Sequence, residues 1–258
     1  MSLLGLQRDG SGPVLVWLHG FTQTRDSAHE FRSILTGTYE VLSIDLPGHG
    51  ENASIAASLD DTADLLADVL PNEPFIMGGY SFGGRVALHF ALRHRARLSG
   101  LVLLSATLGI RDEVERAARR YRDDALARHI EEIGAQAFLD EWLAQPMFTA
   151  LAPDPLERAA RSHDAKGLAD SLRFAGTGTQ TFLGDRAREL DVAALVVAGA
   201  HDQKFLAEAE LLEDTLVNAT MHTVANAGHA AHLERPQLFA ELLSRLTPVA
   251  IEAQQDHE

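Results

Sequence analysis

The chain has 258 residues, of which 46% are hydrophobic and 23% are charged, which is typical of a globular α/β protein and excludes a disordered or collagen-like chain. Lys and Arg number 22 against 37 Asp and Glu, and the formal charge of −15 disfavours nucleic acids and anionic membranes as partners. Cysteine is absent, which excludes disulfide bonds, thiolate metal sites and a cysteine nucleophile.

The N-terminal sequence lacks a basic segment followed by a long apolar stretch, and no uncharged run is long enough to span a bilayer. We therefore expect a cytoplasmic protein that binds small molecules or other proteins.

Short apolar runs bounded by turn residues recur along the chain and predict strands that are buried on both faces. These runs are residues 14–18, 41–45, 75–78, 101–104, 194–198 and 221–224. Stretches of helical period lie between them, at residues 59–70, 85–92, 205–217 and 237–246. This alternation predicts an α/β fold with a mostly parallel central sheet flanked by helices.

The alternation stops between residues 111 and 190, where arginine-rich and acidic helical sequence replaces the strand pattern. We interpret this segment as a helical insertion that Pro146, Pro153 and Pro155 break into shorter helices. The predicted organisation is a core of residues 1–110 and 191–258, with residues 111–190 as a helical cap.

The strand at residues 75–78 runs into Gly79-Tyr80-Ser81-Phe82-Gly83, which fits the pattern G-x-S-x-G, and helical sequence follows. In this context the motif holds a serine in a sharp turn with its hydroxyl pointing off the sheet. A serine needs a group that accepts its proton. Asp202 and His229 each follow a predicted strand, in the order serine, acid, histidine. Ser81, Asp202 and His229 are therefore the predicted catalytic residues, although Ser81 could also be a buried turn residue.

An anion that develops on a carbonyl oxygen needs hydrogen-bond donors, and His19-Gly20-Phe21 follows the strand at residues 14–18. We predict that the backbone N–H groups of Phe21 and Phe82 form this oxyanion hole. His229 and His232 could suggest a metal site, but no third ligand is evident. Nucleotide-binding glycine motifs are absent as well, so the sequence predicts neither a metal nor another cofactor.

These residues together resemble the α/β-hydrolase superfamily, and within it the 2-succinyl-6-hydroxy-2,4-cyclohexadiene-1-carboxylate synthases of menaquinone biosynthesis. The similarity covers both core and cap. The stretches that carry it are His19-Gly20-Phe21, Asp45-Leu46-Pro47-Gly48-His49-Gly50, residues 79–87, residues 115–120, Trp142-Leu143-Ala144-Gln145-Pro146, residues 172–178, Asp202-Gln203-Lys204-Phe205 and residues 227–232.

The resemblance implies a lyase that eliminates pyruvate from an enolpyruvyl cyclohexene carrying two further carboxylates. Arginine suits such a small anionic carboxylate substrate because its planar fork binds carboxylates bidentately. The substrate-binding residues that the resemblance implies are Tyr80, Arg85, Arg120, Trp142, Arg161 and Lys204. Arg119 and Arg122 remain alternatives to Arg120, and Arg158 remains an alternative to Arg161.

The cap arginines could instead have no ligand and form a solvated, salt-bridged helix face, with Asp112–Arg116 and Glu115–Arg119 as i,i+4 pairs. Lys204 could likewise be a surface residue. Two other functions stay open at this point: a carboxylesterase that uses Ser81 covalently, and a non-catalytic ligand-binding protein of the same fold. The sequence leaves open whether the protein is a monomer or a homo-oligomer.

The charge is unevenly divided between the two predicted parts. Residues 111–190 hold 11 of the 20 arginines and carry a formal charge of −3, so most of the excess acid belongs to the core. The overall charge therefore still disfavours polyanions but allows a few arginines to bind a small carboxylate beneath the cap.

Overall fold

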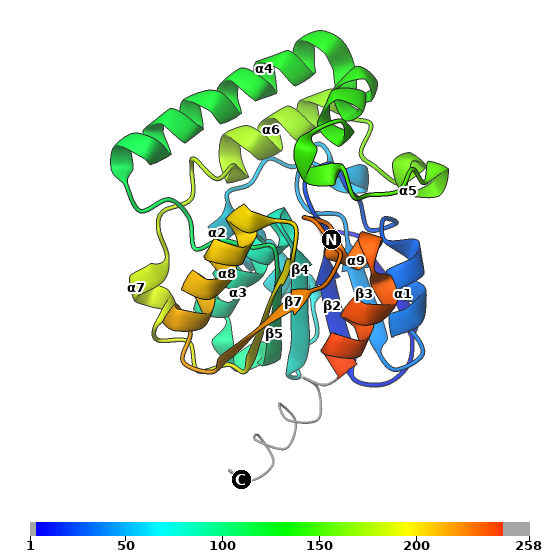
Figure 1. The fold of residues 1–258 in the computed structure, drawn as a ribbon, viewed down its shortest axis with the longest axis vertical. Coiled ribbons are helices and arrows are strands. Elements are labelled where there is room, and N and C mark those ends of the chain that lie inside the picture. The colour runs from blue at the N-terminus through cyan, green and yellow to red at the C-terminus, as the bar shows by residue number, and fades with distance from the viewer. Residues whose placement is uncertain (1–3, 245–258) are drawn as a thin grey trace, which may run out of the picture.

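The computed structural model describes residues 4–244, and in this range a central sheet lies between two layers of helices (Figure 1). Seven strands of the described residues form the sheet, in the order β1-β3-β2-β4-β5-β6-β7. β1 pairs antiparallel with β3, and the other neighbours are parallel. The predicted fold class is therefore confirmed. The strands are β1 (Leu6–Gly10), β2 (Val14–Leu18), β3 (Glu40–Ile44), β4 (Phe75–Tyr80), β5 (Leu98–Leu104), β6 (Ala194–Gly199) and β7 (Ala219–Val224).

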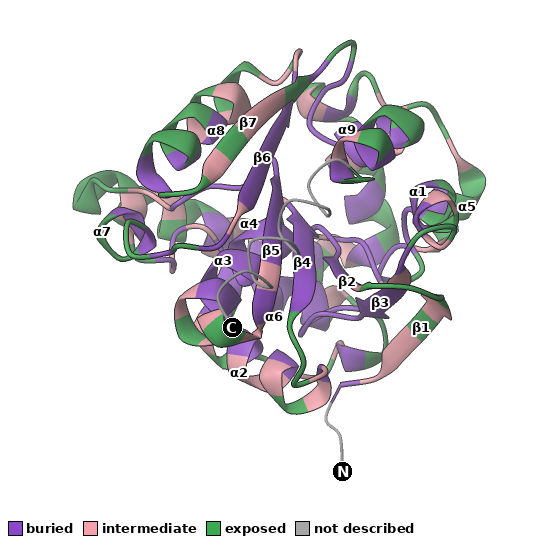
Figure 2. Cartoon of the chain, turned by 90° about the horizontal axis from the view of Figure 1, so that it is seen from below, coloured by how far each residue is buried: buried purple, intermediate pink, exposed green. Residues whose placement is uncertain are grey.

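The central strands are apolar on both faces because helices cover both sides of the sheet, and they are the buried strands in Figure 2. β1 is the strand that the sequence patterns did not predict. Its sequence, Leu6-Gln7-Arg8-Asp9-Gly10, is polar and only partly buried because it lies at the edge of the sheet. An edge strand needs no continuous apolar run, so the criterion for buried strands missed it.

Two groups of helices cover the sheet. α2 (Leu59–Val69), α3 (Phe82–Arg93) and α8 (Gln203–Thr215) contribute to the larger core cluster on one face. α1 (His29–Leu35), α9 (Ala231–Glu234) and the helical residues 236–244 contribute to the cluster on the other face. The last two residues of the helix predicted at 237–246 lie outside the described residues. Short 3₁₀ turns, η1 (Gly50–Asn52) and η2 (Arg95–Arg97), complete this part of the chain.

A helical cap lies over one end of the sheet, the end at which β4 runs into α3 (Figure 1). It comprises α4 (Glu113–Leu143), the 3₁₀ turn η3 (Pro146–Phe148), α5 (Pro155–Ala159) and α6 (Ala165–Ala175). α4 is interrupted at Gly134, whose φ of 79° and ψ of 160° are not helical. Apolar residues of α4 and α6 pack into a small core of their own, which Phe21 and Trp142 also contact.

The cap segment rejoins the core before residue 190. α7 (Gly184–Ala187) follows the cap helices, and Leu183, Ala187 and Leu190 pack within the larger core cluster. The predicted division at residues 110 and 190 stays a prediction, and this packing favours an end of the cap before Leu183. Among residues 4–244, the structure contains no helix that is both long and apolar enough to cross a membrane.

Candidate active site

Ser81 occupies a strained turn between β4 and α3. Its φ of 53° and ψ of −102° lie in a region of backbone conformation that residues other than glycine rarely adopt. The flanking glycines allow the turn because a Cβ at Gly79 would overlap the backbone of Gly83, and a Cβ at Gly83 would overlap the carbonyl of Leu18. The Ser81 N–H donates to the carbonyl of Leu104 at 2.8 Å, which ties the turn to β5. The two glycines therefore leave room for the turn that holds Ser81.

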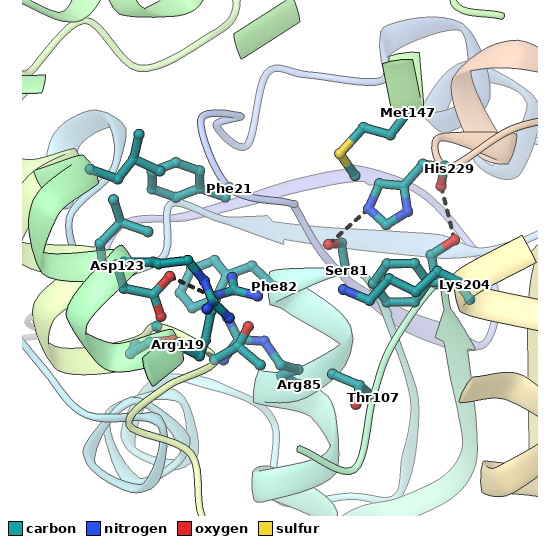
Figure 3. Close-up of a pocket in the computed structure, with 18 of the residues that line it drawn as sticks. Phe21, Ser81, Phe82, Arg85, Thr107, Arg119, Asp123, Met147, Lys204 and His229 are labelled. Carbon is teal, nitrogen blue, oxygen red and sulfur yellow. Dashed lines mark hydrogen bonds and ion pairs between the residues drawn. The ribbon is translucent and has the colours of Figure 1, made fainter. Parts of the chain in front are cut away.

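A hydrogen-bonded chain links Ser81, His229 and Asp202, and Figure 3 shows the contact between Ser81 and His229. The Nε2 atom of His229 lies 3.1 Å from Ser81 Oγ, and its Nδ1 atom lies 2.7 Å from Asp202 Oδ2. Because an ionised carboxylate only accepts, Nδ1 carries the proton and Nε2 is free to accept one from the serine. Ser105 fixes the backbone of the histidine, because its Oγ donates to the His229 carbonyl at 2.9 Å. The structure therefore brings together the three residues that the sequence singled out.

Asp202 has a second, structural partner. It is the N-cap of α8, and its Oδ1 accepts from the Phe205 N–H at 3.3 Å. Phe205 in turn packs against the imidazole of His229, with the ring centroids 4.5 Å apart. The start of α8 therefore orients both the acid and the face of the histidine.

Phe21 and Phe82, whose N–H groups we predicted as the oxyanion hole, both line the cavity at Ser81. Phe82 is the first residue of α3, and Phe21 lies in the loop that follows β2. His19 fixes this loop because its Nε2 accepts from the Leu46 N–H at 2.9 Å while Nδ1 donates to the Gly20 carbonyl at 2.9 Å. This arrangement requires a neutral ring, and burial lowers the pKa of His19 to about 4.

Ser81 and His229 open into a cavity of about 590 Å³ between core and cap. Tyr80, Arg85, Trp142 and Lys204 of the predicted set line it. Tyr80 is buried, and burial raises the pKa of its hydroxyl, so the group is neutral. The Nε1 atom of Trp142 is buried and has no hydrogen-bond partner among the residues that the structure describes.

Two of the predicted substrate-binding arginines do not line this cavity. Arg120 Nε donates to the carbonyl of Gly178 at 3.3 Å, and the cavity wall instead contains Arg119 and Arg122. Arg161 is buried behind the wall, where its Nη1 donates to Thr22 Oγ1 at 2.7 Å. Arg158, the alternative to Arg161, pairs with Asp140 at 2.8 Å on the outside of the cap. Arg119 and Arg122, the two alternatives to Arg120, thus line the cavity, and which arginines bind substrate stays a prediction.

The helical period could have identified the arginines of α4 that line the cavity. Leu126 and Ile130 face the interior of the cap, and Arg119 and Arg122 lie seven and four residues before Leu126, on the same face of α4. Arg120 precedes Leu126 by six residues, which turns it away from that face. The sequence interpretation also missed Gln180, whose Oε1 accepts from Arg85 Nη1 at 3.3 Å. No sequence pattern marks this buried glutamine, because only the contact reveals its role.

The cavity contains both cations and acids, and only some of them are paired. Arg119 forms an ion pair with Asp123 at 2.7 Å, rather than the Glu115 pair that the sequence suggested. Arg85 donates to the Ala175 carbonyl at 2.8 Å, and burial together with the nearby charge of Arg119 lowers its pKa to about 10. Within residues 4–244, Arg85, Arg122 and Lys204 line the cavity without a carboxylate partner in ion-pair contact. The three cations are therefore available to an anionic ligand.

Two further buried histidines, His49 and His232, have structural surroundings. His49 accepts from the Thr22 N–H at 3.3 Å and donates from Nδ1 to the Pro47 carbonyl at 3.0 Å. His232 lies against Trp17, Phe31 and Tyr80, and neither of its ring nitrogens has a partner within the described part of the chain. Burial lowers the pKa of His49 and of His232 to about 3. No group of three or more potential metal ligands occurs among residues 4–244.

Comparison with known proteins agrees with this geometry. A model of the alpha/beta hydrolase family matches residues 15–242. The chain belongs to the alpha/beta hydrolase family. It is 34% identical to the 2-succinyl-6-hydroxy-2,4-cyclohexadiene-1-carboxylate synthase of Enterobacter sp. (strain 638), over 97% of this chain and 98% of the relative. The same synthase from Serratia proteamaculans (strain 568) is 32% identical, over 91% of this chain and 92% of the relative.

Among alpha/beta hydrolase structures, MenH from S. aureus superposes with a TM-score of 0.88 at 30% identity, covering 97% of this chain and 99% of that one. This similarity extends over both core and cap, because almost the whole of each chain is included. The resemblance to the synthases that the sequence motifs indicated is therefore confirmed.

Proposed function

We propose that this protein is a lyase of the 2-succinyl-6-hydroxy-2,4-cyclohexadiene-1-carboxylate synthase type, acting in menaquinone biosynthesis. It eliminates pyruvate from 2-succinyl-5-enolpyruvyl-6-hydroxy-3-cyclohexene-1-carboxylate. One observation carries the proposal: the Ser81–His229–Asp202 chain opens into the cavity in which Arg85, Arg122 and Lys204 lack a carboxylate partner among the described residues. The relatives named for this activity support it.

The charge of the cavity suits that substrate. Its ring, its succinyl arm and its enolpyruvyl group each carry a carboxylate, and three unpaired cations line the cavity. The cations form two groups, since Arg85 lies near Arg119, whereas Lys204 lies on the side of Ser81 and His229 (Figure 3). We assign two carboxylates to the arginine group and one to Lys204. Each charge-assisted hydrogen bond of this kind contributes roughly 1.5–3 kcal/mol to binding.

Proton abstraction begins the reaction. His229 Nε2 takes the hydroxyl proton of Ser81 as Ser81 Oγ removes the ring proton alpha to the succinyl ketone. The electron pair of that C–H bond moves to the ketone oxygen, and the Phe21 and Phe82 N–H groups stabilise the resulting enolate. When the enolate collapses, a double bond forms between the carbon that lost its proton and the adjacent alkene carbon. The alkene double bond of the ring shifts by one position, and the C–O bond to the enolpyruvyl group breaks. His229 returns the proton to the leaving group, which becomes pyruvate, and the ring diene is the second product.

Asp202 acts through His229. Its carboxylate fixes the tautomer in which Nε2 accepts a proton, and it stabilises the imidazolium that forms when the proton arrives. The Coulombic attraction between the carboxylate and that imidazolium is strong because the side chains of His229 and Asp202 are only 2% and 11% exposed, so water screens it little.

The same residues could support ester hydrolysis, since the oxyanion donors would also stabilise a tetrahedral intermediate formed by attack of Ser81 on an ester. The unpaired cations distinguish the two functions, because an uncharged ester has no use for them. We therefore favour the lyase, with a small carboxylate as partner and the cytoplasm as its location.

The decisive experiment supplies the enolpyruvyl substrate and follows pyruvate with a coupled dehydrogenase assay. We expect wild-type protein to release pyruvate well above the spontaneous rate. Ser81→Ala should lose about 10³-fold or more in kcat, because the base is removed. Arg85→Ala should raise KM by roughly 10- to 100-fold through the loss of a charged contact.

Arg158→Ala is the matched control, since it removes a cap arginine that pairs outside the cavity. Pyruvate release that stays at the spontaneous rate would overturn the proposal. Turnover of p-nitrophenyl acetate that depends on Ser81 but not on Arg85 would support the esterase instead. Ligand binding that survives Ser81→Ala with no turnover in the wild type would support a non-catalytic protein.

A further inference from the structure

The loop between β2 and α1 carries the Phe21 N–H, and the cap holds it in an unusual conformation. Thr22 and Ala28 have φ values of 70° and 59°, which residues other than glycine rarely adopt. The cap contacts both ends of this stretch, because the Ser162 N–H donates to the Thr22 carbonyl at 2.7 Å and the Ala28 N–H donates to Glu157 Oε2 at 2.7 Å. Contacts from the cap therefore support a loop conformation that its own sequence does not favour.

The direction of the Phe21 N–H follows from the peptide group that it shares with the Gly20 carbonyl. The group is planar, and the described residues contain no cis peptide, so the N–H points opposite to the carbonyl. Two donors hold the carbonyl oxygen of Gly20: His19 Nδ1 at 2.9 Å and the Gln23 N–H at 3.1 Å. Whatever fixes Gly20 and Gln23 therefore also fixes the oxyanion donor.

The side chain of Gln23 connects the N–H of Gly20, on the other side of the Gly20 Cα, to the cap. Its Oε1 accepts from the Gly20 N–H at 2.8 Å, and its Nε2 donates to Glu157 Oε1 at 3.0 Å. Gln23 is 1% exposed and Glu157 is 5% exposed, so water does not compete for these hydrogen bonds. We call these contacts the Gly20–Gln23–Glu157 chain.

A carboxylate at position 157 determines which way the Gln23 amide faces. Glu157 only accepts hydrogen bonds, so it requires the NH₂ group of Gln23 on its own side and the carbonyl oxygen on the side of Gly20. An amide at position 157 could donate as well as accept, and this requirement would be lost. The buried charge has a cationic neighbour, since Arg161 Nη2 lies 3.8 Å from Glu157 Oε1.

We propose that Glu157, a cap residue that lines no part of the catalytic cavity, is a positioning residue for the oxyanion hole and acts through Gln23 and Gly20. Docking of α5 on the core thus completes the site that stabilises the enolate. The inference rests on the proposed function in one respect, the use of the Phe21 N–H as an oxyanion donor. Both the lyase and the esterase reactions would use that donor.

An exchange of the two side chains tests the chain directly. Glu157→Gln and Gln23→Glu are each expected to lower kcat by roughly 10- to 100-fold while KM stays within about twofold, because the donor matters most when the anion forms. In the double variant, the glutamate at position 23 accepts from the Gly20 N–H and also from the amide NH₂ of the glutamine at position 157. The amide oxygen of that glutamine accepts from the Ala28 N–H. We expect kcat of the double variant to return to within about threefold of wild type.

Ser27→Ala is the matched control. Ser27 Oγ donates to the Ala160 carbonyl at 3.1 Å and accepts from the Thr24 N–H at 3.2 Å. This variant therefore also removes a contact between loop and cap, but it removes no hydrogen bond of Gly20 or Gln23. Its kcat should stay within about twofold of wild type. Melting temperatures of all variants show whether a loss of activity follows merely from unfolding.

Hydrogen–deuterium exchange of the Gly20 amide provides a readout that needs no turnover. Exchange should accelerate about tenfold or more in Glu157→Gln and Gln23→Glu, and it should be slow again in the double variant and in Ser27→Ala. Unchanged kcat and unchanged exchange in both single variants would overturn the positioning role, as would a double variant that is no better than either single one.

These outcomes are separable from those of the proposed function. If the wild type released no pyruvate, the lyase assignment would fail, whereas the exchange data and Ser81-dependent ester hydrolysis would still decide whether Glu157 positions the loop.

Discussion

The core and the cap contribute to the same cavity by different physical means. In the core, backbone constraints position the reacting groups: Ser81 occupies a strained turn, and Gly79 and Gly83 leave no space for a side chain. In the cap, long side chains on α4 supply charge, and Arg119 is oriented by an ion pair with Asp123. The difference teaches that the chemical step depends on rigid backbone, whereas substrate selection depends on side chains that can be exchanged without loss of the fold.

The largest effect on kcat should come from the Ser81–His229–Asp202 chain of the core. Asp202→Asn is expected to lower kcat by about 10³- to 10⁴-fold, because an amide can donate to Nδ1 and so favour the wrong tautomer of His229. Stability should change little, since asparagine also caps a helix well and can replace Asp202 at the start of α8. Steady-state kinetics and the melting temperature measure the two quantities. A loss of only tenfold would mean that His229 is oriented by its ring contacts rather than by the acid.

Substitution of Gly83 in the core and Gly134 in the cap tests whether the backbone is more tightly packed in the core than in the cap. In Gly83→Ala the new Cβ would overlap the carbonyls of Leu18 and His19, which cannot move away, and we expect a loss of about 3 kcal/mol or more in the free energy of unfolding. In Gly134→Ala no atom lies within 4 Å of the new Cβ, and only the φ of 79° opposes it, at a cost of about 1–3 kcal/mol. Denaturant titrations compare them, and equal losses would contradict the distinction.

Substitutions along α4 sharpen the account of the cap. Arg119→Ala and Arg122→Ala should each raise KM for the enolpyruvyl substrate by about 10- to 100-fold with a smaller change in kcat, because each removes a cation from the cavity wall. Arg120→Ala, which removes an arginine that faces away from the cavity, should change KM less than twofold. If all three variants behaved alike, the arginines would act through the general field of the helix rather than by contact.

The smallest effect concerns the pH dependence of stability. Burial lowers the pKa of His232 to about 3, whereas in the unfolded chain the same ring has a pKa near 6.5. The unfolded chain therefore binds a proton between these pH values that the folded protein does not, so the free energy of unfolding is highest above pH 6.5 and falls as the pH drops toward 3. The buried rings of His19 and His49 act in the same direction. His232→Phe should reduce the slope of unfolding free energy against pH by about 1.4 kcal/mol per pH unit near pH 5. An unchanged slope between pH 4.5 and 6 would show that His232 is already protonated in the folded protein.

The same contrast explains how much the sequence could predict. β2 was predicted with its observed bounds because buried strands leave a local pattern. The turns at the strand ends likewise singled out Ser81, Asp202 and His229, which lie in hydrogen-bond contact. Arg120 and Arg161 do not line the cavity. The sequence did not distinguish Arg120 from Arg119 and Arg122 because these arginines lie close together on α4 and only the phase of the helix separates them. Glu157 left no signal at all, since a glutamate in a short helix is usually exposed, and its burial arises from the contact between cap and loop.

The close contact between α6 and the core also bears on how such a protein could be redesigned. A Cβ at Gly48 would lie 2.5 Å from the Gly167 carbonyl oxygen, and a Cβ at Gly167 would lie 2.7 Å from the carbonyls of Gly48 and Ala53. Main chain therefore rests directly on main chain at this point. A cap transplanted from a relative would need a residue without a side chain at both positions, so the pair of glycines sets a compatibility rule for building chimeric enzymes on this core.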